Sequence, residues 1–504
     1  CAYLEPWHLD YEDFLNLRRN TGDDRLRCHD MNTASWIPDE FMRRVENEDT
    51  WYFFDPKDAD LHDRFGEDFD KRYNELCNQA EEGLIKNYRT TPAKELWKKM
   101  LKVLFETSHP WNTFKDPCNI RYTNQHEGAV RSSNLCTEIT LHTKPSEYHK
   151  GEKTKIGETA VCNLGSINVL NHLQEDGEID FDKLKNSIHT AVRMLDNVID
   201  INFYPTKEAS NSNLKNRPVG LGVMGIHDVL HVKNIPIDSN EAVEWNNYFF
   251  EFYSREAILA SSSLAKERGS YQNYEGSLWS QDILPIDSWN NLHKYRKSDA
   301  GKGESLNWSE VRDSIKSNGM RNSNVMAIAP TATIGYINGV EQSIEPNFSV
   351  LFVYENKSGN FYITNPHFVK DMKDRDSWSS EVAALVKSCD GDLSLLNGSI
   401  PDALKEKYKT AFDRDMLKLI ECNAARQKWI DQAVSFNLYN KSTSLKYLND
   451  IYMASWKAGL KTTYYLRNRA ASKIEKSTGS DSKSEPSACS IEAMKNGGTC
   501  ESCQ

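Results

Sequence analysis

The sequence predicts an α/β protein in which parallel strands alternate with helices. Three apolar runs have the length and composition of buried strands, and they cover residues 160–169, 219–223 and 325–328. Long segments with helical periodicity separate them, around 184–199 and 241–268. Parallel strands need a crossover connection, usually a helix, so this alternation is typical of a parallel sheet covered by helices.

The two long helices are predicted from apolar residues that recur every three or four positions. The first ends near Pro205, and the second ends at Gly269, a residue type common just after a helix. The apolar face of the first helix consists of Leu184, Ile188, Val192, Leu195 and Ile199.

Further helices are expected towards both ends of the chain. One begins at Thr91–Pro92, because proline suits the first helical position, and a shorter one follows Ile37–Pro38–Asp39. Two more are expected near 417–436 and 444–458. The polar insertion at 144–155 is predicted to be an exposed loop.

The composition excludes several classes of protein. The 504 residues are 38% hydrophobic, which is ample for a large core, and the length suits about three domains or one large barrel. A net charge of −11 argues against binding polymeric nucleic acid. There is no apolar run of about 18 residues, so we expect neither a membrane span nor a signal peptide. Eleven cysteines without a dense framework indicate a reducing, cytoplasmic location with reduced, metal-bound or catalytic thiols.

The stretch at 131–139 carries three chemically complementary side chains. Asn134, Cys136 and Glu138 alternate with their neighbours, and in an extended strand such positions face the same way. An amide, a thiol and a potential base would then stand side by side. The same spacing also fits an ordinary half-buried strand, so the pattern alone leaves both interpretations open.

The end of the chain is predicted to be a mobile tail with redox chemistry. Residues 472–504 are rich in Ser, Lys, Glu and Gly, too polar to offset the entropy of ordering. Cys500 and Cys503 form a CxxC pair, which closes readily into a disulfide and exchanges with other dithiols. The 35 residues after Tyr465 span about 30–35 Å as a coil. The tail can therefore carry electrons to a site in its own chain or in a neighbouring chain. A structural zinc site is the alternative, but it would need two more ligands than this cysteine pair supplies.

Two other motifs fit structural roles better than ligand binding. The GxGxxG pattern at 220–225 lacks a full preceding strand, and Pro236 interrupts the helix that a dinucleotide site needs, so we expect a glycine-lined strand end. His227 and His231 have metal-ligand spacing on a helix but no evident third ligand. We expect them to be solvated or packed.

Two further motifs are ambiguous on their own. Pro330, Thr331, Ala332 and Thr333 form a turn of small residues after an apolar run, which suits a phosphate group if it opens a helix. The Tyr464–Tyr465 pair would ordinarily be core packing, with each hydroxyl bonded to a partner.

Taken in order, these segments resemble the large (catalytic) subunit of class I ribonucleotide reductase over essentially the whole chain. The motifs that carry the resemblance are Leu4–His8, Ser133–Glu138, Val161–Asn168, Arg217–Gly220, Ala329–Thr333, Ser343–Pro346, Thr462–Tyr465 and the terminal CxxC.

The resemblance implies a ten-stranded α/β barrel with a central finger loop that carries Cys136 at its tip. Cys136 would become a transient thiyl radical that takes the 3′ hydrogen of a ribonucleoside diphosphate and later returns it. Glu138 would be the general base on the 3′ hydroxyl, and Asn134 would position the ribose hydroxyls. Cys162 would be one of two thiols that supply reducing electrons.

The same resemblance implies several partners. A radical made by a metal cofactor in a separate small subunit would reach Cys136 through Tyr465 and Tyr464. This relay and the CxxC tail together favour class I over the cobalamin-dependent class. The turn at 330–333 would hold the substrate diphosphate. Thioredoxin or glutaredoxin would reduce the tail, and a homo-oligomer is expected.

The chain also departs from the family pattern. Family chains have several hundred residues before the position of Cys1, including the partner thiol of Cys162 and most effector-binding segments. We therefore expect residues 1–471 to be an incomplete catalytic barrel that needs an N-terminal half, either as a separate chain or joined by processing. Cys1 is also what intein splicing leaves on a downstream segment.

Two other functions stay open at this point. The chain could be an inactive fragment that serves as an assembly partner, or a dithiol oxidoreductase that acts through Cys500 and Cys503. Replacing Cys136 with Ser separates the dithiol oxidoreductase from the ribonucleotide reductase, because nucleotide reduction would be lost while disulfide exchange by the tail would persist.

Overall fold

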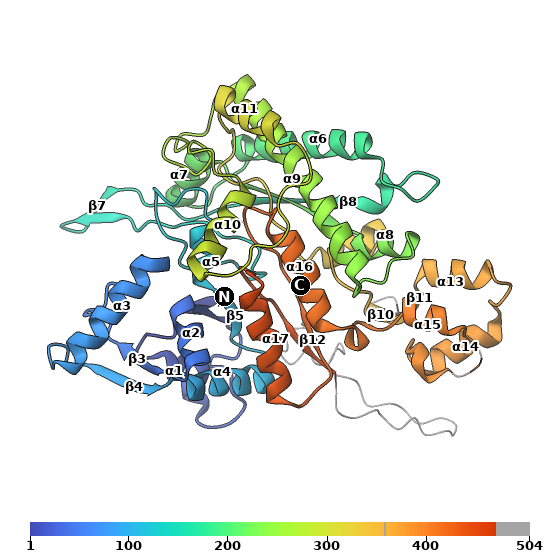
Figure 1. Cartoon of the computed structure of the whole chain (residues 1–504), viewed down its shortest axis with the longest axis horizontal. Helices are drawn as coiled ribbons and strands as arrows, with labels where there is room; N and C mark the ends of the chain where they lie inside the picture. The colour runs from blue at the N-terminus through green and yellow to red at the C-terminus, as the bar shows by residue number, and fades with distance from the viewer. Residues whose placement is uncertain (357–358, 397, 399, 470–504) are drawn as a thin grey trace.

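The computed structural model describes residues 1–356, 359–396, 398 and 400–469. The predicted tail and its cysteines, Cys500 and Cys503, lie outside the described residues. Figure 1 shows the mixed α/β architecture, with helices packed around short strands and a separate group of helices, α13–α15, at one end.

Seventeen α-helices lie in the described part of the chain. They are α1 (Tyr11–Leu15), α2 (Asp39–Asn47), α3 (Gly66–Glu81), α4 (Ala93–Thr107), α5 (Lys115–Ile120), α6 (Phe181–Ile201), α7 (Lys207–Asn216), α8 (Ile226–Val232), α9 (Asn240–Arg268), α10 (Pro285–Arg296), α11 (Ser309–Asn318), α12 (Ala332–Asn338), α13 (Pro366–Lys373), α14 (Ser380–Ser388), α15 (Asp402–Lys407), α16 (Met416–Gln427) and α17 (Leu445–Lys457).

The strands form small sheets of two kinds. Parallel pairing joins β1 (Ala2–Leu4), β2 (Thr33–Ile37) and β5 (Trp111–Phe114), and also β8 (Asn163–Asn168) with β9 (Val219–Met224) and β12 (Leu438–Asn440) with β13 (Leu466–Asn468). Antiparallel pairs are β3 (Thr50–Phe54) with β4 (Tyr88–Pro92), β6 (Glu147–His149) with β7 (Glu152–Lys155), and β10 (Leu351–Asn356) with β11 (Gly359–Thr364).

Single bridges connect the parallel sheets into one row. Parallel bridges join Leu221 to Met326 and Ile328 to Val434, while an antiparallel bridge joins Thr113 to Thr462. The order of neighbouring segments in space is therefore β8, β9, residues 325–328, the segment from Val434 to β12, the segment from Thr462 to β13, β5, β2 and β1. Among the described residues the row does not close, because β1 and β8 each pair on one side only.

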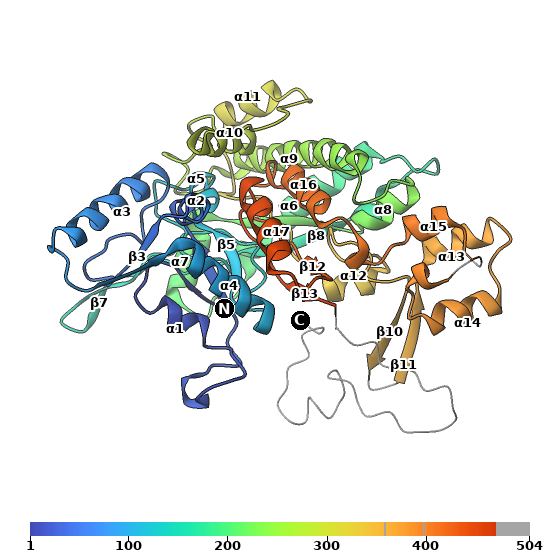
Figure 2. The same cartoon turned by 60° about the horizontal axis from the view of Figure 1, so that its bottom comes forward.

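Helices cover the outside of this row. The long helix α9 packs against α6, α11 and α16, and α6 also packs on β8 and β9. Figure 2 shows α9 running beside α6 and α16 above the strands. One large apolar core joins the row and these helices, while a small second core forms around Phe368 and Tyr408 in the α13–α15 group.

The structure confirms most of the predicted elements. The helices expected after Thr91–Pro92, around 184–199, around 241–268 and near 444–458 are α4, α6, α9 and α17. The exposed insertion at 144–155 is present and contains the hairpin β6–β7.

Two of the predicted elements are wrong in extent. The helix expected near 417–436 ends at Gln427, because the backbone N–H groups of Ala433 and Ser435 bond instead to Glu138 and Ile328. The strand expected at 160–169 covers only 163–168 and is half-buried rather than buried.

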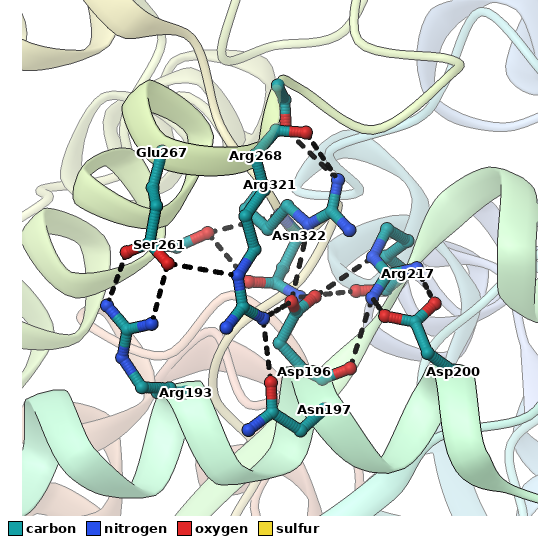
Figure 3. Close-up of polar contacts among 11 residues, drawn as sticks. Arg193, Asp196, Asn197, Asp200, Arg217, Ser261, Glu267, Arg268, Arg321 and Asn322 are labelled. Carbon is teal, nitrogen blue, oxygen red and sulfur yellow. Dashed lines mark hydrogen bonds and ion pairs between the residues drawn. The ribbon is translucent and has the colours of Figure 1, made fainter.

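An ionic cluster fixes the start of β9. The carboxylate of Asp196, on α6 and fully buried, accepts hydrogen bonds from Arg217, Arg268 and Arg321 over 2.9, 3.0 and 3.3 Å (Figure 3). The carboxylate of Asp200 accepts hydrogen bonds from both terminal nitrogens of the Arg217 guanidinium, over 2.7 and 2.8 Å. The cluster therefore ties α6, the end of α9 and the segment before 325–328 to the strand that follows Arg217.

No helix among the described residues combines the length and apolar character needed to cross a membrane.

Candidate active site

The stretch that carries Cys136 is a tight turn and not the extended strand that its alternation suggested. Thr137 has φ of +66°, and its N–H donates to the carbonyl oxygen of Asn134 over 3.3 Å. The turn is held from both sides, because Tyr3 donates to the carbonyl of Asn134 and Thr462 donates to the carbonyl of Thr137, each over 2.8 Å. The turn thus sits between β1 and the segment that leads to β13.

Asn134 and Glu138 meet across this turn. The amide nitrogen of Asn134 donates to Oε1 of Glu138 over 2.9 Å. Glu138 is 2% exposed, and burial raises the pKa of its carboxyl, although the hydrogen bonds from Asn134 and Ser435 oppose the shift. The result is a buried carboxyl whose surroundings raise its proton affinity.

Cys136 lies next to the tyrosine pair. The hydroxyl of Tyr464 donates to the Cys136 sulfur over 3.5 Å, and the rings of Tyr464 and Tyr465 are 3.9 Å apart at their centroids. Trp111 packs edge-on against both rings. Burial, together with the nearby Glu138 charge, raises the pKa of the Cys136 thiol to about 11, so the sulfur carries its hydrogen at neutral pH.

Cys162, the residue before strand β8, is connected to the same site through Gln432. The side-chain nitrogen of Gln432 is 3.4 Å from the Cys162 sulfur, and the Gln432 oxygen accepts the N–H of Thr140, just beyond the turn. Burial raises the pKa of the Cys162 thiol to about 12, and the charge of Glu138 contributes to the shift. Glu138 therefore lies within electrostatic reach of both thiols.

The turn at 330–333 follows a segment that is bonded to the site. Residues 325–328 pair with 433–435, and Ser435 contacts both Cys136 and Glu138. Thr331 has φ of +51° and precedes α12, and its hydroxyl oxygen accepts the N–H of Ser343 over 2.8 Å. The turn thus opens the short helix α12.

Four residues of the site were missed by sequence reasoning. Ser435 and Gln432 fell in a segment expected to be helical, and Trp111 and Tyr3 belong to short strands. No spacing pattern singles them out, since each joins the site through contacts with residues far away in the chain.

The two motifs expected to be structural have structural roles. Gly220 and Gly222 lie within β9, where a Cβ on Gly222 would come within 2.6 Å of the Ala327 carbonyl oxygen, so the glycines allow close strand packing. His227 and His231 are a buried, packed pair with ring centroids 3.9 Å apart.

One other group of side chains in the described part of the chain could act as metal ligands. Glu127, His142 and Glu158 place ligand atoms within 4.8 Å of one another. Lys144 pairs with both carboxylates and Lys215 with Glu158. Ammonium groups thus already compensate the charge that a cation would neutralise.

Comparison with known proteins decides the family. The family model described as "Ribonucleotide reductase, barrel domain" matches residues 1–466. The chain belongs to the ribonucleotide reductase barrel-domain family. The resemblance stated from the sequence motifs is thereby confirmed at the level of the family.

Curated relatives of this ribonucleotide reductase domain come from Chlamydia pneumoniae, Helicobacter pylori and Danio rerio, among other organisms. The ribonucleoside-diphosphate reductase subunit alpha of Chlamydia pneumoniae is 50% identical over 481 residues, which cover 95% of this chain and 45% of that protein. The subunit alpha of Helicobacter pylori strain J99 is 37% identical, with 95% and 61% covered. The large subunit of Danio rerio is 36% identical, with 93% and 56% covered. The chain spans about half the length of the curated relatives it matches.

Proposed function

We propose that the chain supplies the C-terminal portion of a ribonucleotide reductase large subunit and reduces ribonucleoside diphosphates to 2′-deoxy forms. The observation that carries the proposal is the contact of the Tyr464 hydroxyl with the Cys136 sulfur, beside the Asn134–Glu138 pair. A redox-active phenol, a protonated thiol and a buried base thus meet in one place. Ordinary thiol chemistry would instead favour a thiol with a lowered pKa.

The chemistry divides among these side chains as follows. A Tyr464 phenoxyl radical takes the hydrogen atom of the Cys136 thiol, and the phenol is restored. The sulfur radical then takes the 3′ hydrogen of the ribose, since S–H and activated C–H bonds are of similar strength. Glu138 accepts the proton of the 3′ hydroxyl, which eases loss of the 2′ hydroxyl as water.

The remaining steps return the sugar to a closed-shell state. Cys162 and a second thiol supply two electrons and two protons and become a disulfide. Cys136 then gives its hydrogen back to C3′, and the radical returns to Tyr464. Asn134 holds the ribose hydroxyls during these steps, and the turn of Pro330, Thr331, Ala332 and Thr333 holds the diphosphate.

The proposed mechanism implies several partners for the chain. Tyr465 receives the radical from a small subunit that houses the metal cofactor. The CxxC of Cys500 and Cys503, in a tail of residues 472–504, reduces the Cys162 disulfide and is itself reduced by thioredoxin or glutaredoxin. An N-terminal half would complete a ten-stranded barrel around the finger loop, bring the second thiol and bind most effectors.

The row of strands supports the barrel proposal. Three of its eight segments bond to the Cys136 turn, through Tyr3 at one end of the row and through Ser435 and Thr462 nearer the middle. Pairing of further strands with β1 and β8 would close the barrel and leave Cys136 inside it.

A reconstitution assay tests the proposal. The chain is combined with its N-terminal half, a small subunit and thioredoxin, and deoxynucleotide is measured from labelled cytidine diphosphate. We expect turnover from the wild type, none from Cys136→Ser, and near wild-type turnover from Cys422→Ser, in which the buried cysteine lies outside the site. Turnover by Cys136→Ser would refute the proposal, and turnover by the chain alone would refute the need for the N-terminal half.

A further inference from the structure

Ser435 stands between the base and the turn that carries the thiol. Its N–H donates to the Ile328 carbonyl over 2.9 Å, which fixes its backbone, and the residue is 1% exposed. Its hydroxyl lies close enough to donate to the carbonyl oxygen of Cys136 and is 3.3 Å from Oε2 of Glu138. One hydroxyl therefore faces two acceptors.

A serine hydroxyl carries a single proton and can donate to only one of these acceptors at a time. When Glu138 is ionised, its carboxylate is the stronger acceptor and draws the hydroxyl proton away from the Cys136 carbonyl. When Glu138 is protonated, it can donate to the Ser435 oxygen, and the hydroxyl is then directed at the Cys136 carbonyl. The two hydrogen-bond patterns differ in how firmly the turn is held.

We propose that Ser435 is a positioning residue that couples the protonation of Glu138 to the hold on the Cys136 turn. The consequence for catalysis depends on the proposed function. Arrival of the ribose 3′ proton on Glu138 switches Ser435 to the Cys136 carbonyl and secures the turn while the thiol holds the hydrogen that it must return to C3′. Only that proton moves between molecules, from the 3′ oxygen to the carboxylate.

Few other groups around Glu138 could couple its protonation to the Cys136 turn. Asn134 donates to its other oxygen, its own backbone N–H contributes, and the Cys136 and Cys162 thiols and the Tyr3 phenol are near enough to interact electrostatically. Among the described residues, no lysine, arginine or histidine forms an ion pair with Glu138. Ser435 is thus the donor that connects this carboxyl to the backbone at Cys136.

The coupling can be measured on the 1–504 chain without turnover. The Glu138 carboxyl is followed by isotope-edited infrared difference spectra over a pH titration, with Glu138→Gln identifying its band. Loss of a hydrogen bond to a charged group costs about 1.5 kcal/mol or more, so Ser435→Ala should raise the Glu138 pKa by about one unit. Ser435→Thr, which keeps the hydroxyl, should restore the wild-type titration.

A second signal separates coupling from a simple local contact. The cysteine carbonyls are labelled with ¹³C, and Cys136→Ser identifies the infrared band of the Cys136 carbonyl. This band should shift as Glu138 titrates in the wild type and in Ser435→Thr. It should not shift in Ser435→Ala. Ser455→Ala is the matched control, because it removes another buried serine hydroxyl that bonds to a backbone carbonyl, over 2.8 Å to Ile451. It should leave both signals unchanged.

The outcomes are distinct from those of the reconstitution assay. If Ser435→Ala titrates like the wild type, or if its Cys136 carbonyl still follows the pH, the coupling is refuted even when the reconstituted enzyme turns over. If the enzyme makes no deoxynucleotide while both signals behave as expected, the coupling stands and the proposed function fails. Should Ser435→Ala not fold, Ser435→Cys, with its weaker donor, must show an intermediate shift.

Discussion

The hydroxyl of Tyr464 donates a hydrogen bond to the sulfur of Cys136, although the two residues are 328 positions apart in the sequence. The ring of Tyr465, tilted against that of Tyr464, and the edge-on ring of Trp111 hold Tyr464 in place. The phenol oxygen and the sulfur are thus 3.5 Å apart, a separation that suits the proposed transfer of a hydrogen atom between them.

Tyr464→Phe should abolish deoxynucleotide formation in the reconstituted enzyme while the fold is kept. The ring and its contacts remain, but the atom that takes the thiol hydrogen is gone. Product from labelled cytidine diphosphate should fall to background. Tyr11→Phe is the control, because it loses a comparable buried hydrogen bond, 2.7 Å to Ser35, at a cost of about 1 kcal/mol. Substantial product from Tyr464→Phe would argue against the relay.

The site thiols should react slowly with iodoacetamide. The pKa values of Cys136 and Cys162 are raised to about 11 and about 12, so at pH 8 on the order of one Cys136 thiol in a thousand is ionised, and the thiolate is the nucleophile. Mass spectrometry should show the exposed Cys1 modified long before either of them. Equal rates for Cys1 and Cys136 would contradict the environment described for the turn.

The same thiols should make the protein sensitive to alkali. A raised pKa means that the folded state holds the thiol proton more tightly than the unfolded state. The stability this contributes is complete below the unfolded pKa of about 8.5 and is lost as pH rises through about 11 to 12. Urea unfolding of Cys162→Ala should show a smaller loss of stability over this interval than the wild type, and an identical loss would count against the assignment.

Asp196→Asn should destabilise the fold strongly. The substitution keeps the shape but leaves Arg217, Arg268 and Arg321 around a neutral amide in a buried position, and breaking a buried ion pair costs about 3–5 kcal/mol. Asp200→Asn, at a half-exposed position bonded to the same Arg217, should cost about 1 kcal/mol or less. Urea denaturation measures both, and equal effects would show that burial of Asp196 does not matter.

His231→Phe should reduce the acid sensitivity of the fold. Burial holds the pKa of His231 well below its usual value, so the unfolded chain takes up a proton that the folded chain does not. This stability is present above pH 6.5 and is lost as the pH falls below it, by up to about 1.4 kcal/mol per pH unit for each histidine. Neither ring nitrogen of His231 has a hydrogen-bond partner among the described residues, so phenylalanine removes no such bond.

Urea unfolding between pH 7 and pH 5 tests this expectation. The slope of stability against pH should be smaller for His231→Phe by about one proton, with little change at pH 7. A slope identical to that of the wild type would mean that His231 is protonated in the folded chain.

The helices were predictable because their apolar periodicity is local. In α6 and α9 the spacing of apolar residues lies within the segment itself, and Pro205 and Gly269 follow soon after the helices end. The segment at 428–436 was not predictable in this way. Its composition suits a helix, but its backbone pairs with Ile328 and Glu138. Nothing in the segment's own residues indicates those partners.

The site was predictable in its residues and not in its shape. Asn134, Cys136 and Glu138 were picked out by an alternation that suits a strand, yet the structure brings Asn134 and Glu138 together through a turn with Thr137 at positive φ. The local sequence specifies which groups are present. Bonds from Tyr3, Ser435 and Thr462 decide how they are arranged, and these come from other segments.

The hold on the Cys136 turn has a consequence for the order of folding. The residues that secure it, Ser435 and Thr462, lie 299 and 325 positions from their partners, so the loop that must be closed before these bonds form is very long. During synthesis the thiol segment emerges well before the chain that confines it. The sulfur radical proposed above therefore has no site in which to form until almost the entire described chain has been made and docked.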